Sequence, residues 1–502
     1  MVLVASAERV RLPMADLQVK NERICTVTDC PIQADQVLSP GILRCPDGEE
    51  TDNPRSSSHD PSSYRAAAHP AAVHCTARTL LAAIPIALLA LGAPPRAPWL
   101  GPVNAQSVSV LAGNATDDAT SSNNQVKLVR DRAGQLIAAY VQNVGGTPQV
   151  VLAATRDEGR HWTLLAQASS GPIPSRLAAL ALDGGGRLHV AWTRYDDGVG
   201  KIYYRVWQGR WAAPQQRISP SPGYAGFPAL AVDGVGNPHV VWYGIRPAVQ
   251  PGATRHESIY EIFYTGFDGR AWTPPLLIST GLPDAINPAM TSDRTGRLHA
   301  AWYQFDGRVY QVRYAARDGA WSEPETVLAT RYDAFSPDLA VDAGGRAVLA
   351  WEHHEGLSSS IQFARRSGGA WSDPVDLSDR AVASRHPSIS IAPSGTVYVA
   401  WETETGEIIL RRFGTGWEPA VRLTAGGGDS FPSLLASDQG ASVIWTHSAP
   451  GGGSSVRYLR LGSASGATPG SLAQRFGLPV LIAAALFLVV LAGRRRLRPK
   501  AS

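Results

Sequence analysis

The chain has 502 residues, of which 44% are hydrophobic and 18% charged, so it can bury a large core and is not expected to be disordered overall. Its 49 glycines, 37 prolines and 14 tryptophans favour an all-β repeat protein over an enzyme of the α/β type. The net charge of +4 is small for this length, and no basic stripe with interleaved aromatic residues appears, so we expect no nucleic-acid partner.

Residues 1–72 show no sign of a folded core. The segment lacks apolar periodicity and is rich in Pro, Ser and Asp, so we expect a disordered extension or a translation start placed too far upstream. None of the cysteines has the paired Cys-x-x-Cys spacing of a zinc site. The four are Cys25, Cys30, Cys45 and Cys75. We therefore expect no bound metal, no cofactor and no disulfide framework in the rest of the chain.

Residues 73–105 are predicted to be a secretory signal region. Leu80–Leu91 is an apolar run of about a dozen residues behind Arg78, too short to span a bilayer comfortably. Val103–Ala105 offers a small-residue cleavage site. The alternative is an uncleaved hydrophobic anchor.

The strongest signal is an internal repeat within residues 106–461. Its clearest copy is an alternating strand Pro228–Asp233, a turn at Gly236, and a second apolar strand His239–Trp242. An aromatic residue ends the second strand roughly every 45 to 60 residues, which is propeller-blade spacing. These markers are Tyr140, Trp192, Trp242, Trp302, Trp351, Trp401 and Trp445. We expect the tryptophans to be core residues, because they recur at one structural position.

Five of the repeats also carry an aspartate before the glycine turn, which we expect to cap that turn. These residues are Asp183, Asp233, Asp293, Asp342 and Asp438. Two further strands follow each aromatic marker, so one unit is a four-stranded antiparallel blade. The markers predict seven blades, or six if the first unit is irregular.

The last unit supplies only three strands. Ser107–Leu111 resembles the outer strand of other units, such as Gln216–Ser219, so we expect it to complete the last blade and close the ring. An open solenoid is the competing architecture, and the missing fourth strand disfavours it. The fold class is therefore an all-β propeller followed by one C-terminal transmembrane helix.

The C-terminal residues are predicted to anchor this propeller. Residues 462–475 form a flexible Gly/Ser/Ala-rich linker, and Phe476–Gly493 is an uncharged apolar run just long enough to span a bilayer. The basic residues of 494–502 belong in the cytoplasm by the positive-inside rule. We expect a single-pass, bacterial-type cell-membrane protein with its propeller outside. The Leu-Pro-x-Thr-Gly motif of a cell-wall sorting signal is missing.

The run Thr155–Trp162 resembles the Asp box, Ser/Thr-x-Asp-x-Gly-x-x-Trp, of the sialidase-like β-propeller superfamily with its BNR repeats. The resemblance implies that Thr155, Asp157, Gly159 and Trp162 form a structural turn between the two outer strands of a blade. Worn copies end at Trp272 and Trp371. Such repeats occur in sialidases, other glycosidases, lectins and proteins without enzymatic activity.

Sialidases of this superfamily use an arginine triad, a Tyr/Glu nucleophile pair and an Asp acid, and usually carry a Phe/Tyr-Arg-Ile-Pro motif before the first Asp box. No such motif is present here. No catalytic residue is therefore assigned, and the resemblance leaves enzymatic activity undecided while leaning against it.

Loops that enter the innermost strands and loops that leave the second strands should share one face around the propeller channel. Aromatic and charged side chains on this face could stack on sugars and bind hydroxyls or charges. The candidate ligand-binding residues are Arg176, Arg194, Tyr224, Asp284, Arg331, Tyr332, Asp333, Glu352, Arg385 and His386.

Two alternatives apply to this set. Arg176, Arg331 and Arg385 could clamp a carboxylate, or be ordinary exposed arginines. Glu352–Glu355 could offer metal ligands, but adjacent histidines on a strand point to opposite faces, so a solvated loop is the preferred interpretation. Phe227, Phe335 and Phe431 are more simply core residues of the repeat.

The leading hypothesis is a non-catalytic surface module that binds a glycan or a protein on the exposed propeller face. The first rival is a sialidase-like glycoside hydrolase, which needs a pair of carboxylates at the channel mouth. The second rival is a scaffold subunit of an envelope complex.

Overall fold

The computed structural model describes residues 107–122, 124–220, 223–245, 260–280 and 284–462. Within these ranges every regular element is a β-strand, which confirms the all-β prediction. No helix of the described residues is long and apolar enough to cross a membrane. The predicted extension, signal region and transmembrane segment lie outside the described residues.

The strands fall into four radial positions, which we give from the inside outwards. The innermost strands are β2 (Leu128–Arg130), β6 (Ser175–Leu182), β10 (Ala225–Val232), β14 (Ala285–Ser292), β19 (Asp333–Val341), β24 (Ser384–Ile391) and β28 (Asp429–Ser437). The second strands are β3 (Leu136–Val144), β7 (Leu188–Asp196), β11 (Pro238–Gly244), β15 (Leu298–Phe305), β20 (Ala347–Glu355), β25 (Val397–Thr403) and β29 (Gly440–Ser448).

The outer half of each sheet is shorter and less regular. The third strands are β4 (Thr147–Thr155), β8 (Val199–Trp207), β12 (Glu261–Gly266), β16 (Tyr310–Asp318), β21 (Ser358–Ser367), β26 (Ile408–Phe413) and β30 (Ser454–Gly462). The outermost strands are β1 (Ser109–Ala115), β5 (Thr163–Gln167), β9 (Gln216–Arg217), β13 (Leu276–Leu277), β18 (Glu325–Thr326), β23 (Val375–Asp376) and β27 (Val421–Arg422), with β17 (Ala320–Trp321) and β22 (Ala370–Trp371) as short additions.

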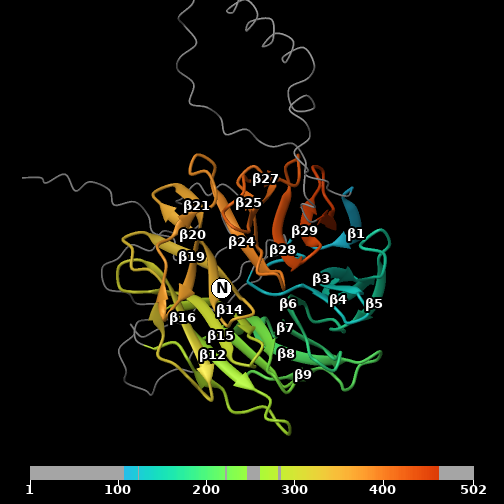
Figure 1. Cartoon of the computed structure of the whole chain (residues 1–502). Helices are drawn as coiled ribbons and strands as arrows, with labels where there is room; N and C mark the ends of the chain where they lie inside the picture. The colour runs from blue at the N-terminus through green and yellow to red at the C-terminus, as the bar shows by residue number, and fades with distance from the viewer. Residues whose placement is uncertain (1–106, 123, 221–222, 246–259, 281–283, 463–502) are drawn as a thin grey trace, which may run out of the picture. The chain divides into compact units, whose positions relative to one another are not determined.

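Antiparallel pairing groups these strands into sheets, which we call blades and name by their strands. The largest sheet has eight strands, because β28–β29–β30–β1 and β2–β5 are joined by a single pair between Ala115 and Gln142. The innermost strands contact one another in sequence from β2 to β28, and β28 contacts β2 again. The sheets therefore surround a central axis as a closed propeller and not as an open solenoid (Figure 1).

The N-terminal strand closes this ring. Strand β1 pairs antiparallel with β30, from Ser109 opposite Tyr458 to Ala115 opposite Ser454. This confirms that the N-terminal segment supplies the missing fourth strand, although the strand begins two residues later and runs further than expected. Both ends of the repeat region are thereby tied into one sheet, which removes an open edge.

The repeat tryptophans form the core of the blades. Trp192, Trp242, Trp302, Trp351, Trp401 and Trp445 are each at most 2% exposed, which confirms the expectation from their spacing. Four of the repeat aspartates also cap turns as expected; Asp183, for example, accepts the backbone amides of Gly185 and Arg187. Asp438 differs, because its carboxylate accepts the amide of Ser394 in the neighbouring blade.

A second set of tryptophans joins adjacent blades. Trp162 of the Asp box packs edge-on against Tyr458, with ring centroids 5.4 Å apart. The equivalent Trp272, Trp321 and Trp371 stand edge-on to Tyr204, Tyr264 and Tyr314 of the preceding blade at 4.8 to 5.3 Å. Edge-to-face aromatic contacts of this kind stabilise an interface beyond the area they bury. The worn Asp boxes have thus kept the residue that packs between blades.

The Asp box itself forms the expected turn between β4 and β5. The Thr155 hydroxyl donates to Asp157 and accepts the amide of Gly159, while Asp157 accepts the amide of His161 at 2.9 Å. Gly159 has φ +86°, and a Cβ there would overlap the Tyr458 ring. Glycine is required at this position for both reasons.

Candidate functional site

The innermost strands carry a bulge where they reach the channel face. One non-glycine residue in each of six innermost strands has φ between +47° and +57°. These are Leu177, Phe227, Asn287, Ser336, His386 and Phe431. The pairing register with the second strand shifts at each of these points. Left-handed backbone is costly outside glycine, but its recurrence at one position makes it part of the repeat and not a mark of one active site.

Polar side chains from the preceding blade bind the amides of these bulges. Glu352 accepts the amide hydrogen of His386 at 2.9 Å, and Glu402 accepts that of Phe431 at 2.6 Å. The Thr193 hydroxyl accepts the amide of Phe227 at 3.1 Å in the same way. Each acceptor directly follows a repeat tryptophan. These side chains therefore fasten each blade to the next.

His386 lies between the two glutamates. Its Nδ1 is 2.9 Å from Glu402, and its ring packs 4.8 Å from that of Phe431. Burial opposes its charge, but Glu402 and Glu352 outweigh burial and raise the pKa of His386 to about 9. Burial likewise opposes the charge of Glu352, yet His354 and His386 lower its pKa to about 2. The group is a buried imidazolium held between two carboxylates.

The central channel is filled by the segment between β1 and β2, residues 116–122 and 124–127, which we call the plug. Thr120 donates its hydroxyl to the Phe431 carbonyl, and Asn124 and Gln125 donate to the carbonyls of Pro288 and Pro228. Lys127 donates to the Ala178 carbonyl at 2.7 Å. Figure 1 shows this segment in cyan running from β1 towards the middle of the ring. The plug therefore bonds innermost strands of several blades at once.

The plug holds an ionisable group away from water. Lys127 is fully buried, and burial lowers its pKa to about 7. Burial raises the pKa of Asp338 to about 7 as well, although that carboxyl accepts the amides of Leu339 and Ile389. The pKa shifts of Lys127 and Asp338 therefore arise from burial within a hydrogen-bonded structural element.

Four of the sequence-predicted residues belong to the blades β6–β9, β10–β13 and β14–β18. Arg176 pairs with Asp118 of the plug, and Arg194 pairs with Asp196 while its guanidinium lies 4.9 Å from the Tyr203 ring centre. Tyr224 packs against Tyr243 and has a raised pKa because it is buried. Asp284 is 9% exposed and burial raises its pKa.

The proposed arginine clamp is spread over three blades. Arg176 lies in β6 and is engaged by Asp118, Arg331 lies two residues before β19, and Arg385 lies in β24. Asp333 accepts the backbone amide of Tyr310 at 2.8 Å, so its carboxylate also supports the backbone.

Glu352–Glu355 belongs to strand β20, so the interpretation as a solvated loop is wrong for this run. Glu352 and His353 are buried, and His354 bonds Glu352 at 3.1 Å. The innermost strand brings Phe335 against His354, with ring centroids 4.9 Å apart. In the part of the chain that the structure describes, no group of three His, Cys, Asp or Glu residues could hold a metal ion.

An exposed chain of polar contacts surrounds the channel end of the β19–β23 blade. Arg331 donates to the Tyr332 hydroxyl at 2.8 Å, and Tyr332 donates to Glu355 at 2.6 Å. Glu355 also pairs with Arg380 at 3.0 Å, on the loop towards the next blade. We call Arg331, Tyr332, Glu355 and Arg380 the rim. Its predicted members are Arg331 and Tyr332, whereas Arg380 was missed.

The rim borders a small pocket of about 190 Å³. Its lining residues are His353, Glu355, Ser358, Ser360 and Arg380. Sequence reasoning did not select the serines or the arginine, because each is an ordinary strand or loop residue when considered singly. Comparing the repeats position by position would have revealed them.

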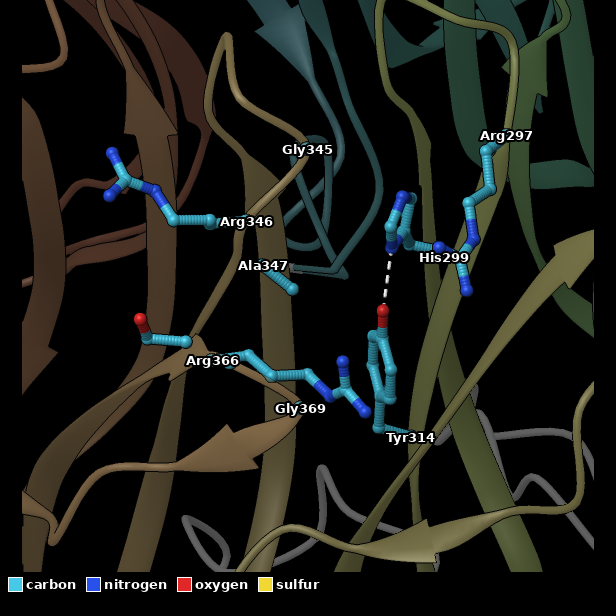
Figure 2. A pocket seen from close by; sticks show the side chains of 10 residues that line it. Arg297, His299, Tyr314, Gly345, Arg346, Ala347, Arg366 and Gly369 are labelled. Atoms are coloured by element: carbon cyan, nitrogen blue, oxygen red, sulfur yellow. Dashed lines mark hydrogen bonds between the residues drawn. The ribbon is translucent and has the colours of Figure 1, made fainter.

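A second groove, of about 160 Å³, lies at the opposite end of the strands, between the blades β14–β18 and β19–β23. Figure 2 shows the Tyr314 hydroxyl bonded to His299, with Arg297, Arg346 and Arg366 around them. The His299–Tyr314 distance is 2.6 Å. Arg346 pairs with Asp342, and Arg366 pairs with Glu325.

The histidine in this groove belongs to a repeated motif. His189, His239 and His299 each bond a tyrosine through Nδ1 and lie 3.3 to 3.4 Å from the turn aspartate through Nε2. Burial lowers the pKa of each of the three. Three copies at equivalent positions indicate that the motif ties the turn to the blade and is not a reaction centre.

No protein-family model matches the chain, and no curated protein matches it. Among solved structures, it is similar to a polysaccharide lyase described as a PL25 ulvan lyase, with 11% identity, a TM-score of 0.49 and coverage of 69% of this chain and 94% of the lyase. It is also similar to the Hadza microbial sialidase Hz136, with 14% identity, a TM-score of 0.40 and coverage of 64% and 74%. A third is the Aleuria aurantia lectin AAL, with 13% identity, a TM-score of 0.40 and coverage of 63% and 99%.

Proposed function

We propose that the protein is an envelope-anchored propeller that binds a glycan at the rim of the β19–β23 blade. The observation that carries this proposal is the exposed chain from Arg331 through Tyr332 and Glu355 to Arg380 beside a pocket. Tyrosine offers a flat face on which a sugar can stack, and the charged groups donate to and accept from hydroxyls. A cluster of charged and aromatic side chains beside a small pocket favours a small polar ligand.

Binding without hydrolysis agrees with how the carboxylates are used. Glu352 and Glu402 both accept bulge amides and flank the His386 cation, so both carboxylates are engaged in hydrogen bonds. A glycosidase acid needs a raised pKa and access to the scissile oxygen. The low pKa of Glu352, about 2, is the reverse of that requirement.

One observation favours the hydrolase alternative. Asp284 is buried, its pKa is raised, and its Oδ1 has no hydrogen-bond partner among the described residues. Those are properties of a general acid. If the protein cleaves a bound glycan, Asp284→Asn should abolish cleavage and leave binding intact, measured by product release and by equilibrium binding.

The remaining architecture is proposed from the chain as a whole. Counting the two halves of the eight-stranded sheet separately, we propose seven blades. We further propose export by residues 73–105, a single transmembrane helix over Phe476–Gly493 and a cytoplasmic basic tail. A scaffold role in an envelope complex would use the same placement with a protein in place of the glycan.

A broad glycan array tests the proposal. Full-length protein would be purified in a detergent without a sugar headgroup, and wild type compared with Tyr332→Ala and with Tyr332→Phe. We expect binding to a narrow glycan class, reduced at least tenfold by Tyr332→Ala, which corresponds to about 1.4 kcal/mol. Tyr332→Phe should lose less, because the ring remains. A blank array from folded wild type would contradict glycan binding and favour a protein partner.

A further inference from the structure

Two buried polar side chains that line the rim pocket each have an atom without a hydrogen-bond partner in the described part of the chain. His353 is 7% exposed and Ser360 is 2% exposed, and neither the Nδ1 of His353 nor the Oγ of Ser360 has a hydrogen-bond partner among the described residues. The two residues are paired directly across β20 and β21, so their side chains share one face of the sheet. Both line the pocket. Buried polar groups are normally bonded, so this pair requires an explanation.

In three other blades the equivalent of Ser360 is a long side chain that fills this space, whereas the last blade carries Ser455 there. Gln149 donates to the Gly171 carbonyl at 2.9 Å, Gln311 donates to the Thr330 carbonyl at 2.7 Å, and Lys201 bonds the Gly223 carbonyl. Each reaches the loop that leads to the next blade. In the β19–β23 blade that task passes to Ser358, which donates to the Arg380 carbonyl at 2.8 Å. Ser360 is too short to fill the space behind it, so the pocket opens there.

The equivalent of His353 in the last blade shows which hydrogen-bond partner His353 lacks. His447 stands opposite Asp429, and its Nδ1 is 2.7 Å from that carboxylate. His353 stands opposite Ala334, whose methyl side chain has no hydrogen-bond donor or acceptor. The same histidine is therefore occupied in one blade and left open to the pocket in the other.

We propose that this pocket is a subsite for one neutral sugar ring, with hydroxyls bonded to His353 Nδ1 and Ser360 Oγ. The inference rests on the proposed glycan binding and specifies which part of the glycan the pocket takes. Arg380 and Glu355 stand at its mouth to donate to and accept from the same ring.

The chemistry of the lining selects a neutral sugar. A sugar hydroxyl donates and accepts at once, which suits serine and a neutral imidazole. Burial and the nearby Arg380 lower the pKa of His353, so the ring is neutral at neutral pH. Arg380, the arginine that lines the pocket, is balanced by Glu355 at 3.0 Å and by Asp376 at 2.9 Å, so the pocket lining offers no spare positive charge to a carboxylate or sulfate. The volume of about 190 Å³ equals about six water molecules at about 30 Å³ each, which accommodates a single ring.

The variants that test this subsite borrow residues which the other blades already accommodate. Ser360→Gln introduces the pocket-filling residue of the blades that carry Gln149 and Gln311, and Ala334→Asp introduces the partner that His447 has. The matched control is Ser455→Gln, at the serine paired with His447 in the last blade. Circular dichroism and the thermal midpoint of each variant establish that it folds.

Saturation-transfer NMR and titration calorimetry would be run on full-length protein with the methyl glycosides of glucose, galactose, mannose and fucose, and with methyl glucuronide. We expect at least one neutral glycoside to bind, with affinity lowered at least tenfold by Ser360→Gln and by Ala334→Asp and unchanged by Ser455→Gln. Unchanged binding in folded Ser360→Gln would overturn the subsite while leaving the proposed function standing. Stronger binding of the glucuronide than of every neutral glycoside would also overturn it. Absence of binding on both the array and these probes would remove the proposed function together with the subsite.

Discussion

The carboxylate of Glu352 accepts the backbone amide hydrogen of His386 at 2.9 Å, although the two residues belong to successive blades. The amide lies at a left-handed bulge, and the His386 side chain in turn bonds Glu402 at 2.9 Å. A carboxylate that the sequence offers as a candidate ligand-binding residue therefore links two successive blades. This relationship leads to two predictions about stability.

Glu352→Ala should destabilise the protein by about 3–5 kcal/mol, because it leaves the buried His386 amide without an acceptor and removes one of the two carboxylates that flank the buried imidazolium. Glu355→Ala is the matched control, since Glu355 lies on the same strand but is exposed, so its loss should destabilise the protein far less. Urea unfolding followed by tryptophan fluorescence measures both. Equal losses of unfolding free energy in the two variants would show that Glu352 does not stabilise the contact between the blades.

The contribution of His386 should depend on pH in a defined direction. Its pKa in the folded protein is about 9, above its ordinary value of 6.5, so its stabilising effect is complete below pH 6.5 and is lost as the pH rises through 9. The stability difference between wild type and His386→Asn should therefore shrink by on the order of 3 kcal/mol across that window. Unfolding curves at a series of pH values from 6 to 10 measure this difference. A difference that stays constant with pH would contradict a charged His386.

Gly159→Ala should weaken the contact between the Asp box and the last blade. Gly159 has φ +86° and faces the Tyr458 ring, whereas Gly134 has a nearly identical φ of +84° with open space around it. Gly134→Ala should thus cost only the backbone strain, about 1 kcal/mol, and Gly159→Ala should cost at least about 1 kcal/mol more. Thermal unfolding of the two variants gives the comparison. Equal losses of stability in Gly159→Ala and Gly134→Ala would show that the clash with Tyr458 does not contribute.

Thr120→Val should loosen the plug. The Thr120 hydroxyl donates to the Phe431 carbonyl at 2.8 Å and lies 2.7 Å from the Thr446 hydroxyl. Valine removes both contacts of this hydroxyl and leaves its buried partners short of a hydrogen bond, at a cost of about 1–3 kcal/mol. The control Thr163→Val changes an exposed strand position and should have almost no effect. Hydrogen exchange of the innermost strands, together with unfolding midpoints, reports the loss. Identical exchange in both variants would contradict a plug that supports the ring.

Much of the fold could be predicted because the sequence repeat follows from burial and turn geometry. Period-2 alternation, glycine turns and a tryptophan at one position follow from burial on a blade. The missing strand of the last unit indicated that Ser107–Leu111 would close the ring, and the closing strand is Ser109–Ala115. The Asp box at Thr155–Trp162 was also found at its expected turn. The plug was not foreseen, since a short polar segment gives no sign of which carbonyls it will meet.

The candidate site was predictable in place but not in its bonding. The channel face, Arg331 and Tyr332 followed from topology, whereas the use of Glu352 as a fastener depends on a contact to His386 that no spacing reveals. Ser360 and Ala334 were invisible for a different reason. Ser360 matters because three blades carry a longer residue at its position, and Ala334 matters because the last blade has Asp429 opposite its histidine. Neither contrast shows in one residue taken singly.

The central claim is that a glycan occupies the rim of the β19–β23 blade, and a crystal structure of the protein with a glycan selected on the array tests it most directly. The account predicts one sugar ring in the pocket within hydrogen-bond distance of His353 and Ser360, with a neighbouring ring on Tyr332. A glycan found instead in the Arg297–Arg366 groove or at another blade would contradict it.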